Sequence, residues 1–155
     1  MKIRPLDAPE AEALLELWTV STTASETDTI ADIARLARQP HARCLLADVD
    51  SQIVGSIIAT FDGWRGNIYR LAVRPEHRRR GIARALVAAA EEAFAEWGVR
   101  RVTALVERDH PWAVGFWNAV GYDLDVRIAR FVRNLPRGAR VDGRTSGGRR
   151  RVRDG

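Results

Sequence analysis

The sequence predicts an α/β fold in which helices cover both faces of one sheet. Two observations lead to this prediction. Segments rich in aliphatic and β-branched residues alternate along the chain with segments whose apolar residues recur every three or four positions. The resulting order is strand, helix, helix, three strands, helix, strand, helix, strand. Within residues 67–98, the apolar period also changes from that of a strand to that of a helix at Gly81.

The chain begins with a short predicted strand, residues 2–6. Asp7 is then a candidate N-cap for an amphipathic helix. The apolar face of that helix consists of Ala11, Leu14, Leu15, Leu17 and Trp18. A polar run rich in Ser and Thr follows, and it supplies Thr27 and Asp28 as candidate caps for a second helix, residues 30–38.

Three strands come next, and we place them at residues 43–49, 52–61 and 68–73. Asp50 and Ser51 make the first turn between them. The third strand ends at Pro75, which has no N–H to donate to a sheet ladder. We expect this third strand to be buried at the centre of the sheet.

The second half of the chain starts with a long helix after Gly81. Its apolar positions are Ile82, Leu86, Ala89, Ala90, Ala93, Phe94 and Trp97. Gly98 closes this helix. We then predict a strand at residues 101–106, a short helix at residues 112–120, and a last antiparallel strand at residues 122–134, where apolar residues alternate loosely.

Length and composition indicate one globular domain. The chain has 155 residues, of which 46% are hydrophobic, and this is enough for a sizeable core. No segment approaches the roughly 18 consecutive apolar residues of a membrane span, and the start does not resemble a signal peptide. We therefore expect a cytoplasmic protein. The single cysteine, Cys44, excludes an internal disulfide, and the three histidines have no metal-ligand spacing.

The positive charge is concentrated at the C-terminal end. Residues 136–155 contain seven arginines and two aspartates, a net charge of 7 − 2 = +5, which equals the +5 of the whole chain. This Gly/Arg-rich segment has few apolar residues, so we expect a folded domain at residues 1–135 and a disordered tail at residues 136–155. The tail is either a weak contact for nucleic acid or another polyanion, or a solvated extension.

The junction between the central strand and the long helix has the features of an anion site. It reads Arg78-Arg79-Arg80-Gly81-Ile82-Ala83. Gly81 has no Cβ, and the first N–H groups of the helix point outward beside it. With the helix dipole and three arginines, this turn suits a diphosphate better than a single phosphate. The alternative is a surface arginine cluster before an ordinary helix. The phosphate-loop pattern GxxxxGK[ST] and a GxGxxG that opens a helix after a strand are both absent.

Together with the preceding strand, Arg78-x-x-Gly81-x-Ala83 resembles [QR]-x-x-G-x-[GA], the acyl-CoA-binding motif of the GNAT superfamily of N-acyltransferases. A second segment, residues 101–122, is similar to that family's strand followed by N-x-x-A-x-x-F-Y-x-x-x-G-[FY]. The resemblance covers most of residues 1–135. It implies the GNAT fold, a mixed and mostly antiparallel sheet with helices on both faces.

The resemblance also implies where acetyl-CoA binds. The pantetheine arm is expected along the central strand, where that strand separates from residues 101–106. Leu71 N–H then faces the thioester carbonyl and stabilises the oxyanion, and Val73 N–H faces the arm. The family motifs place the following residues against the cofactor: Leu71, Ala72, Val73, Arg78, Arg79, Arg80, Gly81, Ile82, Ala83, Arg84, His110 and Trp117. An acceptor amine attacks directly, without an acyl-enzyme.

Two positions depart from the family pattern. His110 replaces an asparagine that contacts CoA, and Trp117 replaces a tyrosine that often protonates the departing thiolate. An indole N–H does not release a proton near neutral pH. Solvent can protonate the thiolate, and Tyr122 and Tyr69 are alternative acids. In a regular strand, Tyr69 lies on the same face as Leu71.

The general base is equally open. Some GNAT enzymes have a glutamate four residues before the leucine position, where this chain has Asn67. Glu107 is the nearest candidate in sequence; otherwise it is a solvent-facing carboxylate, and water removes the amine proton. Four tryptophans are available for an acceptor pocket. We expect Trp18 and Trp112 in the core and single out Trp64, which lies in a turn.

These observations predict an acetyl-CoA-dependent N-acetyltransferase with a primary amine as acceptor. The acceptor is a small amine, an antibiotic, or a protein N-terminus or lysine. Two alternatives remain open: an acyl-CoA-binding module without catalysis, and a nucleic-acid-associated protein that acts through its tail. The sequence does not define the oligomeric state, and a dimer is compatible with it.

Overall fold

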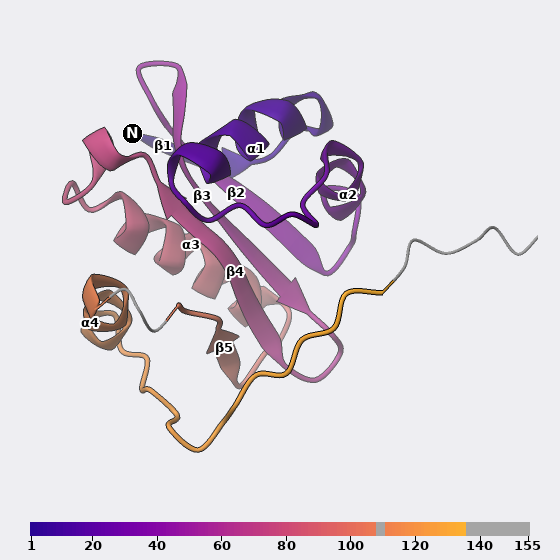
Figure 1. Ribbon diagram of the computed structural model, residues 1–155, viewed down its shortest axis with the longest axis vertical. Helices are drawn as coiled ribbons and strands as arrows, with labels where there is room; N and C mark the ends of the chain where they lie inside the picture. The colour runs from indigo at the N-terminus through magenta and orange to yellow at the C-terminus, as the bar shows by residue number, and fades with distance from the viewer. Residues whose placement is uncertain (108–110, 136–155) are drawn as a thin grey trace, which may run out of the picture. The chain divides into compact units, whose positions relative to one another are not determined.

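The computed structural model describes residues 1–107 and 111–135 (Figure 1). The chain divides into two units, Met1–Asp123 and Leu124–Gly155. All the described helices and strands belong to the first unit. The tail that we predict at residues 136–155 lies outside the described residues, so the domain boundary at residue 135 stays a prediction.

One five-stranded sheet organises the first unit. Its strands are β1 (Lys2–Pro5), β2 (Ala42–Val49), β3 (Gln52–Phe61), β4 (Gly66–Val73) and β5 (Val102–Ala104), in that spatial order. The pairs β1–β2, β2–β3 and β3–β4 are antiparallel, whereas β4 and β5 are parallel. The predicted mixed, mostly antiparallel sheet is confirmed.

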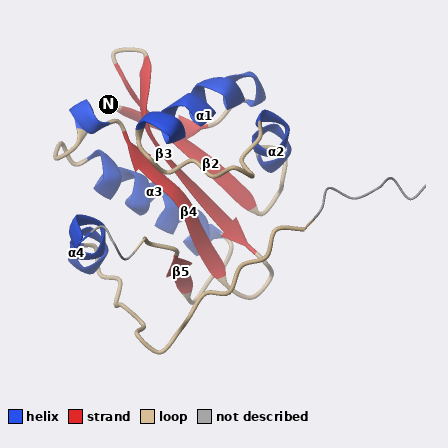
Figure 2. Cartoon of the chain, in the orientation of Figure 1, coloured by secondary structure: helices blue, strands red, loops and turns tan. Residues whose placement is uncertain are grey.

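Helices cover both faces of this sheet, as predicted. They are α1 (Ala11–Val20), α2 (Ile30–Leu36), α3 (Ile82–Glu96) and α4 (Pro111–Ala119), with short 3-10 turns at Ala8–Glu10 and Pro75–His77. Figures 1 and 2 show α1 and α2 on one side of the sheet and α3 on the other.

Each face has its own hydrophobic cluster. The α1/α2 cluster includes Leu14, Leu17, Trp18, Ile33, Leu46, Ile58 and Ala72. The α3 cluster includes Ile57, Ile68, Leu86, Ala90, Phe94 and Trp117. In a strand, successive side chains point to opposite faces, so neighbours such as Ile57 and Ile58 belong to different clusters.

The start of α3 lies unusually close to β3. A Cβ added at Gly55 would lie 3.0 Å from Ile82 Cγ2 and 3.1 Å from Leu86 Cδ1, closer than normal van der Waals contact. The absence of a side chain at Gly55 therefore lets the first two turns of α3 pack directly on the strand. This contact fixes the position of the turn that precedes the helix.

The cap of α2 differs from the prediction. Thr29, and neither Thr27 nor Asp28, is the N-cap, since its Oγ1 accepts a hydrogen bond of 3.1 Å from Asp32 N. Asp28 is unavailable because its carboxylate binds other partners, Arg70 and the backbone N–H of Ser25.

The predicted last strand is wrong. Residues 122–135 form no strand, and in the second unit residues 124–135 contain neither helix nor strand. Their apolar side chains are exposed, including Ile128 at 74% and Phe131 at 95%. The apolar alternation breaks between these two residues, so no single face of a strand would collect them.

Candidate active site

The central strand β4 contains a β-bulge. Ile58 pairs with Tyr69 and Ser56 pairs with Ala72, so two residues of β4, Arg70 and Leu71, lie opposite the single residue Ile57. The bulged residue Arg70 has a φ of 51°, in the left-handed region that residues other than glycine seldom occupy.

The bulge reverses the faces of the strand. Before it, Ile68 belongs to the α3 cluster; after it, Ala72 belongs to the α1/α2 cluster, although the two are four residues apart. Leu71 packs against the α3 cluster, whereas Tyr69 lies opposite Ile58 on the other face. The expectation that Tyr69 and Leu71 share a face is therefore wrong, because it assumed a regular strand.

Next to the bulge, β4 and β5 separate. Their pairing extends only from Gly66 to Ile68, and it ends with a long bond of 3.5 Å from Leu105 N to Ile68 O. Among the described residues, the rest of β4 pairs only with β3. Arg74 N donates to Val54 O of β3 at 2.8 Å. Successive N–H groups of a strand point to opposite edges, so Val73 N–H points away from β3, toward the edge where β5 no longer pairs with β4. The predicted separation of the two strands is present.

The turn before α3, residues 78–83, is called the arginine turn below, and its backbone has the features of an anion site. Arg79 and Gly81 both have positive φ, of 63° and 80°, and Gly81 is the N-cap of α3. The first helical bond runs from Ala85 N to Gly81 O, so the earlier amides of the helix have no intrahelical acceptor. A Cβ added at Gly81 meets no atom within 4 Å, so the space above the turn is open. Such a concave row of N–H groups favours an anion.

Positively charged side chains surround this turn, and among the described residues they have no carboxylate partner. They are Arg78, Arg79, Arg80 and Arg84. Arg78 Nε donates to Val73 O at 3.3 Å, which holds the turn against the end of β4. The same guanidinium lies 5.3 Å from the ring centre of Trp112 on α4. A cluster of arginines beside the first amides of a helix fits a diphosphate.

The aromatic residues of α4 pack inward, with one exception. Trp117 is buried, and its ring contacts those of Phe116 and Tyr122 at centroid distances of 5.6 and 4.9 Å. Tyr122 OH donates to Glu91 Oε1 at 3.1 Å, and burial together with that carboxylate raises the pKa of Tyr122. Trp112 is 61% exposed, so its predicted place in the core is wrong.

The other predicted residues are spread over the site. Tyr69 is 37% exposed on the α1/α2 face, and Glu107 is exposed just beyond β5. Asn67 pairs with residues of both neighbouring strands. His110 lies outside the described residues. Proton-transfer roles for Tyr69, Tyr122 and Glu107 stay predictions. Sequence reasoning missed Arg70, since a bulge leaves no local pattern.

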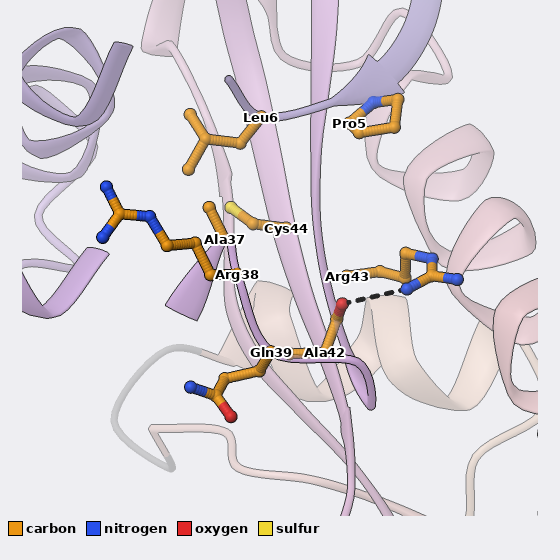
Figure 3. Close-up of a pocket in the computed structure, with 8 residues that line it drawn as sticks. All are labelled: Pro5, Leu6, Ala37, Arg38, Gln39, Ala42, Arg43 and Cys44. Carbon is orange, nitrogen blue, oxygen red and sulfur yellow. Dashed lines mark hydrogen bonds between the residues drawn. The ribbon is translucent and has the colours of Figure 1, made fainter. Parts of the chain in front are cut away.

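A pocket of about 290 Å³ lies elsewhere, near the end of α2 (Figure 3). Its lining consists of Pro5, Leu6, Ala37, Arg38, Gln39, Ala42, Arg43 and Cys44, none of which belongs to β4 or the arginine turn. Burial raises the pKa of the Cys44 thiol to about 12. A thiol that stays protonated is a poor nucleophile, so the pocket offers no reactive group.

Comparison with known proteins agrees with this geometry. The family model described as acetyltransferase (GNAT) family matches residues 11–122. The chain belongs to this family. An acetyltransferase of Pectobacterium atrosepticum is 32% identical over 124 residues, which cover 79% of this chain and 88% of that protein. The GNAT chain is therefore an acetyltransferase, and acetyl-CoA is its acyl donor.

Solved structures share the fold of this GNAT protein. The aminoglycoside 6′-N-acetyltransferase AAC(6′)-Ig of Acinetobacter haemolyticus superposes with a TM-score of 0.73 at 21% identity, covering 88% of this chain and all of that one. AAC(6′)-Iy, in complex with a bisubstrate analogue of CoA and acetylneamine, gives a TM-score of 0.73 at 18% identity, covering 86% and 98%. Among the described residues of this GNAT chain, no helix is long and apolar enough to cross a membrane, and no group of acidic, His or Cys side chains could hold a metal ion.

Proposed function

We propose that the protein transfers the acetyl group of acetyl-CoA to a primary amine by direct attack. The observation that carries the proposal is the continuity between the bulged strand and the arginine turn. The amides of β4 that β5 leaves unpaired end at Val73, and after the short 3-10 turn Pro75–His77 the chain reaches the arginine turn, which Arg78 holds against Val73 O. A thioester at one end and a diphosphate at the other therefore fit a single path.

In this path each group has a distinct task. The turn from Arg78 to Ala83, with Arg84, holds the diphosphate through amides and guanidinium groups. Val73 N–H binds the pantetheine arm. Leu71 N–H donates to the thioester oxygen as it becomes an oxyanion, and a positioned donor of this kind lowers a barrier by about 3 kcal/mol. Ala72 has its buried side chain on the opposite face, so it contributes backbone only.

The protons have several routes. Tyr122 is a weak acid here because its pKa is raised and its hydroxyl already binds Glu91. Tyr69 is more exposed and lies on the face that α1 and α2 cover. The departing thiolate, with an ordinary thiol pKa of about 8.5, can also take its proton from water. The proton of the attacking amine goes either to Glu107 or to water.

The acceptor is the open part of the proposal. The structures that share the fold include aminoglycoside N-acetyltransferases, so amino sugars come first in a screen. Small amines, peptide N-termini and lysine peptides complete the panel.

The test measures free thiol released from acetyl-CoA by the purified protein with each amine of this panel. Acceptor-dependent release establishes the transferase and identifies its substrate class. Tight CoA binding without release by any amine favours a binding module, and absence of CoA binding removes the assignment of the arginine turn.

A further inference from the structure

We propose that the ion pair between Asp28 and Arg70 positions the oxyanion donor. The pair ties the loop between α1 and α2 to the bulge of β4, one residue before Leu71. This inference rests on the proposed function, because it assigns a purpose to the geometry of the Leu71 amide.

The ion pair is well formed and sheltered. Arg70 Nη2 lies 2.7 Å from both carboxylate oxygens of Asp28, and the two side chains are 28% and 15% exposed. Asp28 itself is held within its loop: its Oδ2 accepts from Ser25 N at 2.7 Å, and its N–H donates to Ser25 O at 2.9 Å. The carboxylate therefore presents a fixed partner, unlike a freely moving surface charge.

Three elements converge on Arg70. Ser56 Oγ on β3 donates to Arg70 O at 3.1 Å, and the same hydroxyl accepts from Trp18 Nε1 on α1 at 2.9 Å. The Arg70 guanidinium lies 5.5 Å from the ring centre of Trp18. Asp28, in the loop between α1 and α2, provides the third contact. The carbonyl group and the side chain of Arg70 are thus both held, and these contacts oppose relaxation of its left-handed backbone.

The consequence for the site follows from the covalent chain. The peptide plane that carries Leu71 N–H is set by ψ of Arg70 and φ of Leu71. If Arg70 leaves the left-handed region, this plane rotates and the N–H no longer points where the oxyanion forms. The loop that carries Asp28 and the donor at Leu71 are therefore coupled, although they are 43 positions apart in the sequence.

The first experiment uses Asp28→Asn, which keeps the size of the side chain and removes its charge. We expect hydrogen exchange of backbone amides to accelerate in two peptides, residues 21–29 and 69–73. We also expect turnover with the panel amine that the wild-type protein uses to fall by about tenfold, and the Kd of CoA to stay within about twofold, because the arginine turn is untouched. Asp28→Glu restores much of the turnover.

The matched control is Glu16→Gln. Glu16 on α1 forms an ion pair with Arg74, the residue that follows β4, at 3.2 Å, and neither residue belongs to the bulge. The Glu16→Gln variant should leave turnover and the hydrogen exchange of residues 69–73 unchanged. Unchanged exchange in residues 69–73 of Asp28→Asn overturns the proposal, as does an equal effect of Glu16→Gln.

A second variant separates the backbone from the ion pair. Arg70→Gly can adopt the left-handed conformation without strain, but glycine populates other conformations as readily, and without the guanidinium no contact from its own side chain holds its backbone at the bulge. The proposal predicts that it loosens residues 21–29 and loses turnover as Asp28→Asn does; wild-type turnover with a loosened loop overturns it. Hydrogen exchange and CoA binding need no acceptor. If the wild-type protein transfers no acetyl group, the proposed function fails, and exchange still decides whether the loop and the bulge are coupled.

Discussion

Gly81 is the residue whose replacement tests the cofactor site most directly. Its φ of 80° and the open space above it suit a turn whose amides approach a diphosphate. We predict that Gly81→Val weakens CoA binding by at least about a hundredfold, measured by calorimetry, because the branched side chain fills the approach to the amides and disfavours the left-handed backbone.

Gly63 offers a matched control for that variant. It also has a left-handed backbone, with a φ of 94° and no atom within 4 Å of an added Cβ, but it lies in the connection between β3 and β4. Gly63→Val should lose a similar stability, about 1–2 kcal/mol, and bind CoA normally. Normal CoA binding by both variants would remove the diphosphate from the arginine turn.

Cys44 shows how burial controls reactivity. Because its pKa is about 12 in the folded protein, we predict no alkylation by iodoacetamide at pH 8, followed by mass spectrometry, and rapid alkylation in denaturant. The raised pKa also makes the free energy of unfolding depend on pH. The folded state favours the protonated thiol, so the contribution of Cys44 to stability is complete below the ordinary thiol pKa of about 8.5 and is lost as pH rises from there toward 12. Fast alkylation of the folded protein would contradict the burial of this thiol.

Replacement of two buried serines by alanine should change the free energy of unfolding in opposite directions. Ser21 Oγ has no hydrogen-bond partner among the described residues, whereas Ser56 Oγ binds both Trp18 Nε1 and Arg70 O. Ser21→Ala should raise the free energy of unfolding by about 1 kcal/mol, since it removes an unpaired buried hydroxyl. Ser56→Ala should lower it by about 1–3 kcal/mol and leave the indole N–H unpaired. Urea denaturation measures both, and equal losses would contradict the difference in pairing.

At the scale of elements, local patterns were sufficient where an element depends on its own residues. The long helix and the three central strands follow from apolar periodicity, and Gly81 and Gly98 mark helix ends through their backbone freedom. The predicted strand at residues 122–134 failed because a strand requires a partner with matching register.

The bulge illustrates the limit of sequence reasoning within the site. Nothing in the sequence of β4 indicates a left-handed arginine, because the groups that hold Arg70 come from α1, β3 and the loop before α2. The arginine turn was predictable since its glycine and arginines are contiguous. The relation between Tyr69 and Leu71 was not, since a single inserted residue exchanges the two faces of the strand.

The cap of α2 gives a test at the same scale. We predict that Thr29→Ala lowers the free energy of unfolding by about 1 kcal/mol, because it removes the acceptor for Asp32 N. Thr27→Ala is the control, since the hydrogen bond that Thr27 Oγ1 forms within the described residues is with Ser25 Oγ, in an exposed part of the loop, and not with the backbone of α2. Chemical denaturation of both variants decides the matter, and a larger loss from Thr27→Ala would favour the cap first expected from sequence.

At the scale of the whole molecule, the net charge and the folded elements lie in different parts of the sequence. Residues 1–135 are close to neutral and include the sheet and the candidate active site, whereas residues 136–155 carry the net charge of +5. Because the arginine turn lies in the first part, the sequence contains two basic regions, and each is a candidate for polyanion binding. Binding to heparin alone would not distinguish them.

Truncation after Leu135 distinguishes them when it is combined with a variant of the turn. We predict that truncation lowers the salt concentration at which the protein elutes from heparin and leaves the Kd of CoA and the thermal unfolding midpoint unchanged. Arg79→Gln with Arg80→Gln should instead weaken CoA binding and change heparin elution less, since it removes two charges and leaves the seven arginines of the tail. Loss of CoA binding on truncation would mean that the tail takes part in the cofactor site, and unchanged heparin elution would remove polyanion binding from its roles.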